Sequence, residues 1–93
     1  MAYFAIHCID KPDSAELRAA TRPAHLAYIE TVLDRVLAAG PLLDMDGKPL
    51  GSLLIIDFPD REAAIEFAAG DPYALAGLFG SVAVTAWRKV YPA

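Results

Sequence analysis

The sequence predicts an α+β domain with the element order β-α-β-β-α-β, in which a four-stranded antiparallel sheet carries both helices on one face. Three observations lead to this prediction. Four short apolar runs suit strands, two Ala-rich segments between them suit helices, and Asp46-Gly47 joins the middle two strands as a hairpin. This is the ferredoxin-like, split β-α-β arrangement. A chain of 93 residues supports one core, so residues 1–93 are expected to form a single domain.

The first strand is expected over residues 2–9, an apolar and aromatic run without Gly or Pro. A helical segment should follow it. Asp13 or Ser14 offers an N-cap, and residues 15–20 have high helix propensity.

The first helical region contains Pro23, which cannot donate a backbone hydrogen bond and clashes with the carbonyl four residues back. We therefore expect a kink or a restart at residues 21–23, with Pro23 in the first turn of a new helix. Apolar residues at three- and four-residue steps then predict the main amphipathic helix. They are Leu26, Ile29, Leu33, Val36 and Leu37. Gly40-Pro41 is expected to end this helix.

A hairpin is predicted in the middle of the chain. Leu42-Leu43 is a short extended piece, residues 44–49 contain the Asp-Gly turn signal, and residues 50–58 form an apolar run typical of a buried strand. The turn is expected to be exposed and remote from any catalytic group.

The last third of the chain predicts two helices and a strand. Asp60 is a good N-cap for a helix over residues 61–69. Asp71-Pro72 combines an N-cap with Pro at the first helical position, so a short helix over residues 73–79 is expected. Residues 82–90 are rich in β-branched and aromatic side chains and predict the last strand.

The composition argues against several classes of function. Eight basic and twelve acidic residues give a net charge of −4, which repels a nucleic-acid backbone. No apolar run is long enough to span a membrane and no leader pattern begins the chain, so a cytoplasmic protein is expected. The single Cys8 cannot form an internal disulfide, and spaced metal-binding motifs are absent. We therefore expect no metal and no cofactor.

The predicted sheet has one face without helices, and a second copy of the chain is the expected cover. The hydrophobic fraction of 56% is high for so small a domain, which also favours a homodimer. Alternating strand positions could supply an apolar face there. The two candidate sets are Phe4, Ile6 and Cys8 on the first strand, and Ala83, Thr85 and Trp87 on the last.

His25 and Asp71 are the candidate catalytic residues. A neutral imidazole accepts a proton near pH 7, and a carboxylate on its other nitrogen fixes the tautomer. Each residue also has a structural explanation. His25 suits the first turn of a helix, and Asp71 before a proline suits an N-cap.

Three further residues are candidates for substrate binding. Arg22 could bind an anionic group of the substrate or form a structural ion pair. Ser52 could donate a hydrogen bond to a substrate oxygen, or it could be a small residue tolerated at the end of a strand. Tyr73 offers an aromatic wall, as does Trp87, although burial in a core or interface is the commoner role of such residues. His7 and Cys8 are adjacent on a strand and point to opposite faces, so both are interpreted as structural.

Five segments in matching order resemble the YciI-like, or YCII-related, domain family along the length of the chain. They are Arg22-Pro-Ala-His-Leu26, Ala39-Gly-Pro-Leu-Leu43, Gly51-Ser-Leu-Leu-Ile55, Ala69-Gly-Asp-Pro-Tyr73 and Val84-Thr-Ala-Trp-Arg-Lys-Val90. The resemblance implies a dimeric α+β barrel. It also implies a His–Asp pair in a cleft, with His25 at the family's RPxH histidine and Asp71 at its DPY aspartate.

The resulting hypothesis is a small cofactor-free enzyme that performs proton abstraction, elimination or isomerisation on a small cyclic, quinone-like or carbonyl compound. Two alternatives stay open. One is a non-catalytic dimeric module that binds a small ligand or a protein, and the other is a cofactor-free monooxygenase of the same barrel type. A likeness of fold does not by itself decide among them.

Overall fold

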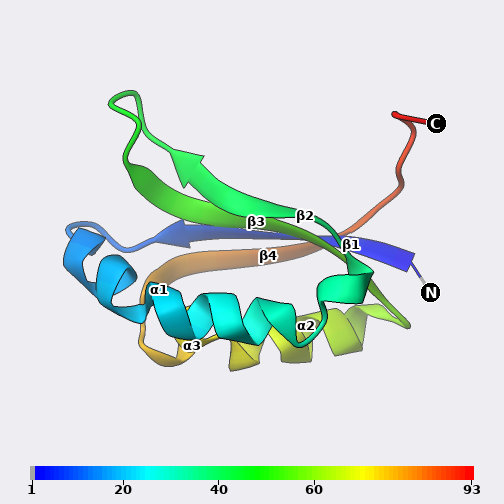
Figure 1. Cartoon of the computed structure of the whole chain (residues 1–93), viewed down its shortest axis with the longest axis horizontal. Helices are drawn as coiled ribbons and strands as arrows, with labels where there is room; N and C mark the ends of the chain where they lie inside the picture. The colour runs from blue at the N-terminus through cyan, green and yellow to red at the C-terminus, as the bar shows by residue number, and fades with distance from the viewer. Residues whose placement is uncertain (1) are drawn as a thin grey trace.

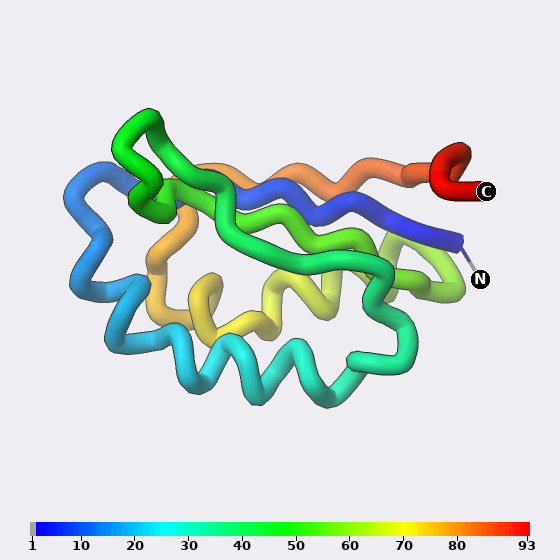
Figure 2. Tube along the Cα trace, turned by 45° about the horizontal axis from the view of Figure 1, so that its top comes forward, coloured from blue at the N-terminus to red at the C-terminus, as the bar shows by residue number. Residues whose placement is uncertain are grey.

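The computed structural model describes residues 2–93 and confirms the predicted α+β, ferredoxin-like fold (Figure 1). Along the chain the elements are β1 (Ala2–Asp10), α1 (Ala15–Glu30), a 3-10 turn η1 (Leu33–Arg35), β2 (Val36–Leu43), β3 (Pro49–Phe58), α2 (Arg61–Gly70), α3 (Pro72–Leu75) and β4 (Phe79–Trp87). The strands form one antiparallel sheet in the order β2-β3-β1-β4. The helices all lie on one side of it (Figure 2).

The core lies between the sheet and the helices. Phe4 pairs with Ile56 and Ile6 pairs with Leu54, so these side chains point to the same face. They pack with the remaining buried residues of the core, which are Cys8, Ile29, Val32, Phe58, Ala64 and Ala68. Burial of this set is the main apolar contribution to folding, at roughly 25 cal/mol per Å² removed from water.

One of the two candidate sets for the open face was therefore wrong. Phe4, Ile6 and Cys8 face the helices, because the buried side chains of α1 and α2 pack on that side. Their partners on β4 are Ala86, Val84 and Val82, which leaves the other set on the open face. That set is Ala83, Thr85 and Trp87.

The open face of the sheet is mostly apolar. By the strand register it carries Tyr3, Ala5, His7, Leu53, Ile55, Ala83, Thr85 and Trp87. Tyr3 and Trp87 meet edge to face with ring centroids 5.9 Å apart. Beside Tyr3, Asp57 has a buried carboxylate oxygen, Oδ1, with no hydrogen-bond partner among the described residues.

The main helix ends earlier than its apolar stripe predicts. α1 stops at Glu30, and the predicted helical residues Val36 and Leu37 belong to β2. These residues suit a strand as well as a helix, and pairing with β3 decides the outcome. Pro41 is tolerated in β2 because this strand is at the edge of the sheet.

Pro23 does not break the first helix, contrary to expectation. α1 is continuous from Ala15 to Glu30, so His25 lies in its middle and not at a helix start. Pro in a helix interior costs about 3 kcal/mol. The buried side of α1, which contains Arg18, His25 and Ile29, holds the helix to the sheet on both sides of the proline. At the N-terminus the cap is Ser14, without a side-chain capping bond.

The N-cap of α2 is the residue that the sequence predicts. Asp60 accepts a hydrogen bond from the backbone N–H of Ala63 at 2.8 Å, which confirms its capping role. α3 is shorter than predicted and ends at Leu75, because Gly77 at φ +78° turns the chain. β4 accordingly begins at Phe79, and it ends at Trp87, before the predicted boundary.

The hairpin between β2 and β3 has the predicted exposed turn. Asp44 accepts hydrogen bonds from the backbone N–H groups of Asp46 and Lys48 at 2.8 and 2.9 Å. Gly47 adopts φ +81°, a conformation that favours glycine. The turn therefore holds the backbone of Lys48 in a fixed place.

Two strand glycines provide a matched test of the sheet. A methyl group at Gly51 would overlap the backbone carbonyl oxygen of Cys8, whereas a methyl group at Gly40 meets no atom within 4 Å. Gly51→Ala should therefore lower the free energy of unfolding by about 1–3 kcal/mol, the usual cost of overpacking. Gly40→Ala should change it by less than about 0.5 kcal/mol. Urea unfolding of both variants measures the difference, and equal effects would contradict the close β1–β3 approach.

Candidate active site

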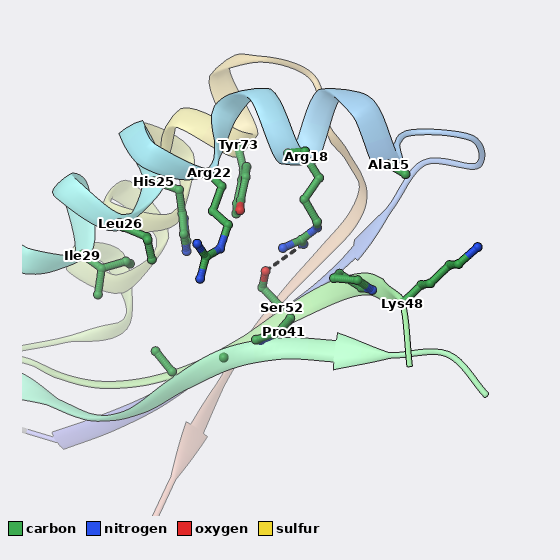
Figure 3. A pocket seen from close by; sticks show the side chains of 14 residues that line it. Ala15, Arg18, Arg22, His25, Leu26, Ile29, Pro41, Lys48, Ser52 and Tyr73 are labelled. Carbon is green, nitrogen blue, oxygen red and sulfur yellow. Dashed lines mark hydrogen bonds between the residues drawn. The ribbon is translucent and has the colours of Figure 1, made fainter. Parts of the chain in front are cut away.

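A cavity of about 390 Å³ opens between α1 and the strands β2 and β3 (Figure 3). One wall is a face of α1, the floor is formed by β2 and the start of β3, and Tyr73 of α3 closes the inner side. The lining residues are Ala15, Arg18, Ala19, Arg22, His25, Leu26, Ile29, Ala39, Gly40, Pro41, Lys48, Pro49, Ser52 and Tyr73.

The polar residues of the α1 wall follow the helical repeat. Arg18, Arg22 and His25 are separated by four and three residues, so they share one face of the helix. Figure 3 shows all three side chains pointing from α1 toward the sheet. The continuity of α1 through Pro23 is what brings them into one row.

His25 and Asp71 meet in the structure. His25 Nδ1 lies 2.9 Å from both Oδ1 and Oδ2 of Asp71, and the two residues are only 7% and 2% exposed. Because a carboxylate is purely an acceptor, Nδ1 carries the proton of this hydrogen bond. Nε2 then has no hydrogen-bond partner among the described residues, and it belongs to a ring that lines the cavity.

Asp71 also caps α3. Its Oδ1 accepts a hydrogen bond from the backbone N–H of Tyr73 at 2.9 Å. Capping and orientation of the imidazole are therefore performed by the same carboxylate. The bonds fix the carboxylate in position, since the start of α3 and the middle of α1 both hold it.

Tyr73 is held between two side chains of α1. Its ring stacks on His25 with centroids 4.1 Å apart, and the Arg18 guanidinium carbon lies 4.6 Å from the ring centre. Burial raises the pKa of Tyr73, while the charges of Arg18 and Arg22 act to lower it. The hydroxyl therefore stays protonated near neutral pH and is a hydrogen-bond donor. Figure 3 shows it pointing into the cavity.

A buried ion pair supports the inner end of the cavity. Arg18 donates to Asp10 through Nε at 2.6 Å and through Nη2 at 2.9 Å. The same Nη2 donates to Ser52 Oγ at 2.9 Å. Ser52 is thus an acceptor in this bond, which leaves its own hydroxyl proton available to a ligand.

Arg22 and Lys48 are cations that line the cavity without an ion-pair partner among the described residues. Lys48 and Pro49 come from the hairpin turn, so the expectation that this turn is remote from the site was wrong. Figure 3 shows Lys48 across the cavity from Ala15 at the start of α1, so the end of the turn contributes to the rim of the cavity.

The five candidate residues chosen from the sequence come together at this cavity. His25, Arg22, Ser52 and Tyr73 line it, and Asp71 lies behind His25. Their roles stay predictions. The other aromatic candidate, Trp87, lies on the open face of the sheet against Tyr3 and takes no part in the cavity.

Sequence reasoning missed Arg18, its partner Asp10, and Lys48. The spacing of Arg18 from Arg22 and His25 was a usable signal, but the expected break at Pro23 concealed it. The pairing of Arg18 with Asp10 had no local signal, because the two residues belong to different elements.

Metal clusters and membrane-spanning helices are both absent from the described residues. Within residues 2–93, no three His, Cys, Asp or Glu side chains gather as a metal site would require. In the same part of the chain, no helix combines the length and apolar character needed to cross a membrane.

Comparison with known proteins identifies relatives over nearly the whole chain. A family model described as the YCII-related domain matches residues 2–88. Protein YciI of Escherichia coli O6:H1 is 38% identical, covering 95% of this chain and 98% of its own length. An uncharacterized protein of Haemophilus influenzae is 35% identical, covering 96% and 99%.

Solved structures include a related enzyme. The 5-chloro-2-hydroxyhydroquinone dehydrochlorinase TftG of Burkholderia phenoliruptrix AC1100, solved with 2,5-dihydroxybenzoquinone, superposes with a TM-score of 0.88 at 32% identity. The match covers 92% of this chain and 93% of that one. An antibiotic biosynthesis monooxygenase superposes with a TM-score of 0.57 at 17% identity, covering 97% and 99%, which shows a shared fold alone.

Cys8 provides a test of burial next to the site. Burial raises the pKa of Cys8 to about 12, and the carboxylates of Asp71 and Asp10 act in the same direction. Only a thiolate reacts with a disulfide reagent. At pH 8 the folded protein should therefore react with such a reagent at least roughly a hundredfold more slowly than the protein unfolded in guanidinium chloride.

The raised pKa of Cys8 also predicts how the stability of the fold changes with pH. The unfolded chain loses the thiol proton near its ordinary pKa of 9.0 and the folded chain retains it, so the folded state loses stability as the pH rises above that value. Equal labelling rates of folded and unfolded protein at pH 8 would contradict this placement of Cys8.

Proposed function

Because this chain belongs to the YCII-related domain family, we propose that it is a cofactor-free enzyme that moves protons on a small cyclic, quinone-like or carbonyl compound. The observation that carries the proposal is the hydrogen bond between His25 and Asp71 at the wall of a cavity of ligand size. In this proposal His25 is the general base and acid, and Asp71 orients it.

The geometry supports a simple proton transfer. Asp71 holds the proton on Nδ1, so Nε2 presents its lone pair to the ligand. Nε2 takes a proton from a carbon next to a carbonyl group. The electron pair of the broken C–H bond forms a C=C bond to the carbonyl carbon, and the π pair of the C=O bond moves onto the oxygen to give an enolate. In an elimination the leaving group departs with its own bonding pair. In an isomerisation the imidazolium returns the proton to another carbon. Asp71 stabilises the imidazolium between these steps.

The cavity suits a compound of about one ring. Leu26, Ile29 and Pro41 supply apolar walls, while Arg22, Ser52 and Tyr73 supply a few polar groups that bind the substrate in one orientation. TftG acts on a chlorinated hydroxyhydroquinone and was solved with a dihydroxybenzoquinone. Loss of hydrogen chloride involves no net oxidation, so an acid–base pair is sufficient for a reaction of that class.

The monooxygenase alternative receives less support. The monooxygenases that superpose on this chain are 17% and 18% identical to it and share only the fold. A non-catalytic binding module would use the same cavity, and the variants described below separate it from an enzyme.

We further propose that the protein is a homodimer in which the open faces of two sheets meet. Leu53, Ile55 and Trp87 on this face are side chains that a second copy would cover.

The catalytic proposal predicts a loss of turnover in two variants. With a chlorinated hydroxyhydroquinone as the first substrate, His25→Ala should lower kcat by about 10²–10⁴. Asp71→Asn should lower it less. The amide still caps α3, but it no longer carries the charge that stabilises the imidazolium. Release of chloride measures the rate.

Asp60→Asn is the matched control for the carboxylate. Asp60 caps α2 as Asp71 caps α3, and it lies outside the cavity, so its amide variant should retain full activity. Full activity of His25→Ala would end the proposal. Ligand binding without turnover in the wild type and in every variant would identify a binding module.

The dimer proposal predicts a change of mass on one substitution. Ile55→Glu places a charge at the centre of the open face and should give a monomer by light scattering at micromolar concentration. Leu75→Glu adds the same charge on α3, at a leucine that is 75% exposed on the helix side, and should leave the dimer intact. A wild-type protein of monomeric mass would refute the proposal.

A further inference from the structure

The charges around the cavity are unusual for an acidic chain. The whole chain has a net charge of −4, yet no Asp or Glu lines the cavity. Its lining cations are Arg18, Arg22 and Lys48. Asp10 neutralises Arg18 through two hydrogen bonds, so Arg22 and Lys48 are left as the positive charges that a ligand would meet.

Arg22 lines the cavity, although the residue as a whole is exposed to solvent. Its positive charge acts to lower the pKa of the Tyr73 hydroxyl, against the larger effect of burial. Figure 3 shows the Arg22 side chain extending from α1 toward the strands beside His25 and Tyr73. The guanidinium therefore faces the space where a ligand of one ring would lie.

Two hydroxyl groups point to the same region. Ser52 uses an oxygen lone pair for Arg18 and keeps its proton free, and Tyr73 stays protonated. With Arg22 they provide three donors. No Asp or Glu lines the cavity, so a negatively charged acceptor for these donors would have to come from a ligand.

We propose that the cavity binds its ligand as an oxyanion, a phenolate or enolate, with the charged oxygen on Arg22 and the hydroxyl groups of Ser52 and Tyr73. This inference rests on the proposed function for the ring-bearing class of ligand. It adds the ionisation state of that ligand and the residue that selects it. Lys48 at the rim attracts the anion over a longer distance.

The same donors serve the proposed reaction. When His25 takes a proton next to a carbonyl group, negative charge develops on the carbonyl oxygen. Arg22, Ser52 and Tyr73 then hold that oxygen in a partly dry cavity, where fixed donors stabilise charge more strongly than water does. A ligand that is already ionised occupies this position before any proton moves.

A coloured phenol tests the ionisation state directly. 4-Nitrophenol absorbs visible light as the phenolate and not as the phenol, so a pH titration of the bound probe reports its ionisation midpoint. In the wild type the midpoint should lie at least about one pH unit below that in water, which corresponds to about tenfold tighter binding of the phenolate than of the phenol. 2,5-Dihydroxybenzoquinone serves as a second probe.

Matched variants assign the effect to a residue. Arg22→Gln should abolish most of the shift and weaken phenolate binding about tenfold. Arg88→Gln removes the same charge from an exposed position after β4 and should leave the shift unchanged. Ser52→Ala should remove a smaller part. Thermal unfolding of each variant checks that the fold is retained.

The outcomes separate this inference from the proposed function. A bound probe with the same midpoint as in water, a shift that Arg22→Gln leaves intact, or failure of both probes to bind at millimolar concentration would overturn the inference. Preferred binding of 4-nitrobenzoate over nitrophenolate would overturn the phenolate assignment. Since His25→Ala should keep the shift while losing turnover, activity and ionisation can fail independently of each other.

Discussion

The carboxylate of Asp71 is the group on which the site depends. It is almost fully buried, and it binds the backbone N–H of Tyr73 and the imidazole of His25 at the same time. A buried carboxylate without such partners would cost several kcal/mol, so its bonds tie α3 to α1. The stacking of Tyr73 on His25 follows from this connection.

Arg18 provides a second anchor of the same kind. Its bonds reach Asp10 at the end of β1 and Ser52 on β3, and its guanidinium covers the ring of Tyr73. On α1, Arg18 lies before Pro23, and His25, the partner of Asp71, lies after it. This arrangement gives a physical reason for the uninterrupted helix: each half is fixed to the sheet or to α3, so a missing hydrogen bond in between does not separate them.

Local signals explain what the sequence could predict. Asp-Gly in the hairpin and Asp-Pro before α3 each determine a turn or cap within a few residues, and both were located correctly. The end of α1 depended on whether Val36 pairs with β3, which no local pattern decides. The partners of Arg18 likewise come from separate elements. His25 and Asp71 were candidates from their chemistry and matched a family motif, while their contact required the fold.

Part of the floor of the cavity is the edge strand β2, and this has a consequence for how such proteins diverge. β2 has a single neighbour in the sheet, and Ala39 and Pro41 present small side chains at the cavity. Larger residues at these two positions would reshape the chamber without repacking the interior, which α1, α2, β1 and β3 fill. The proposed base, His25, lies on α1, and Asp71, which would orient it, caps α3. Substitutions on β2 can therefore change the shape of the chamber, and with it the molecules that fit, while leaving His25 and Asp71 in place.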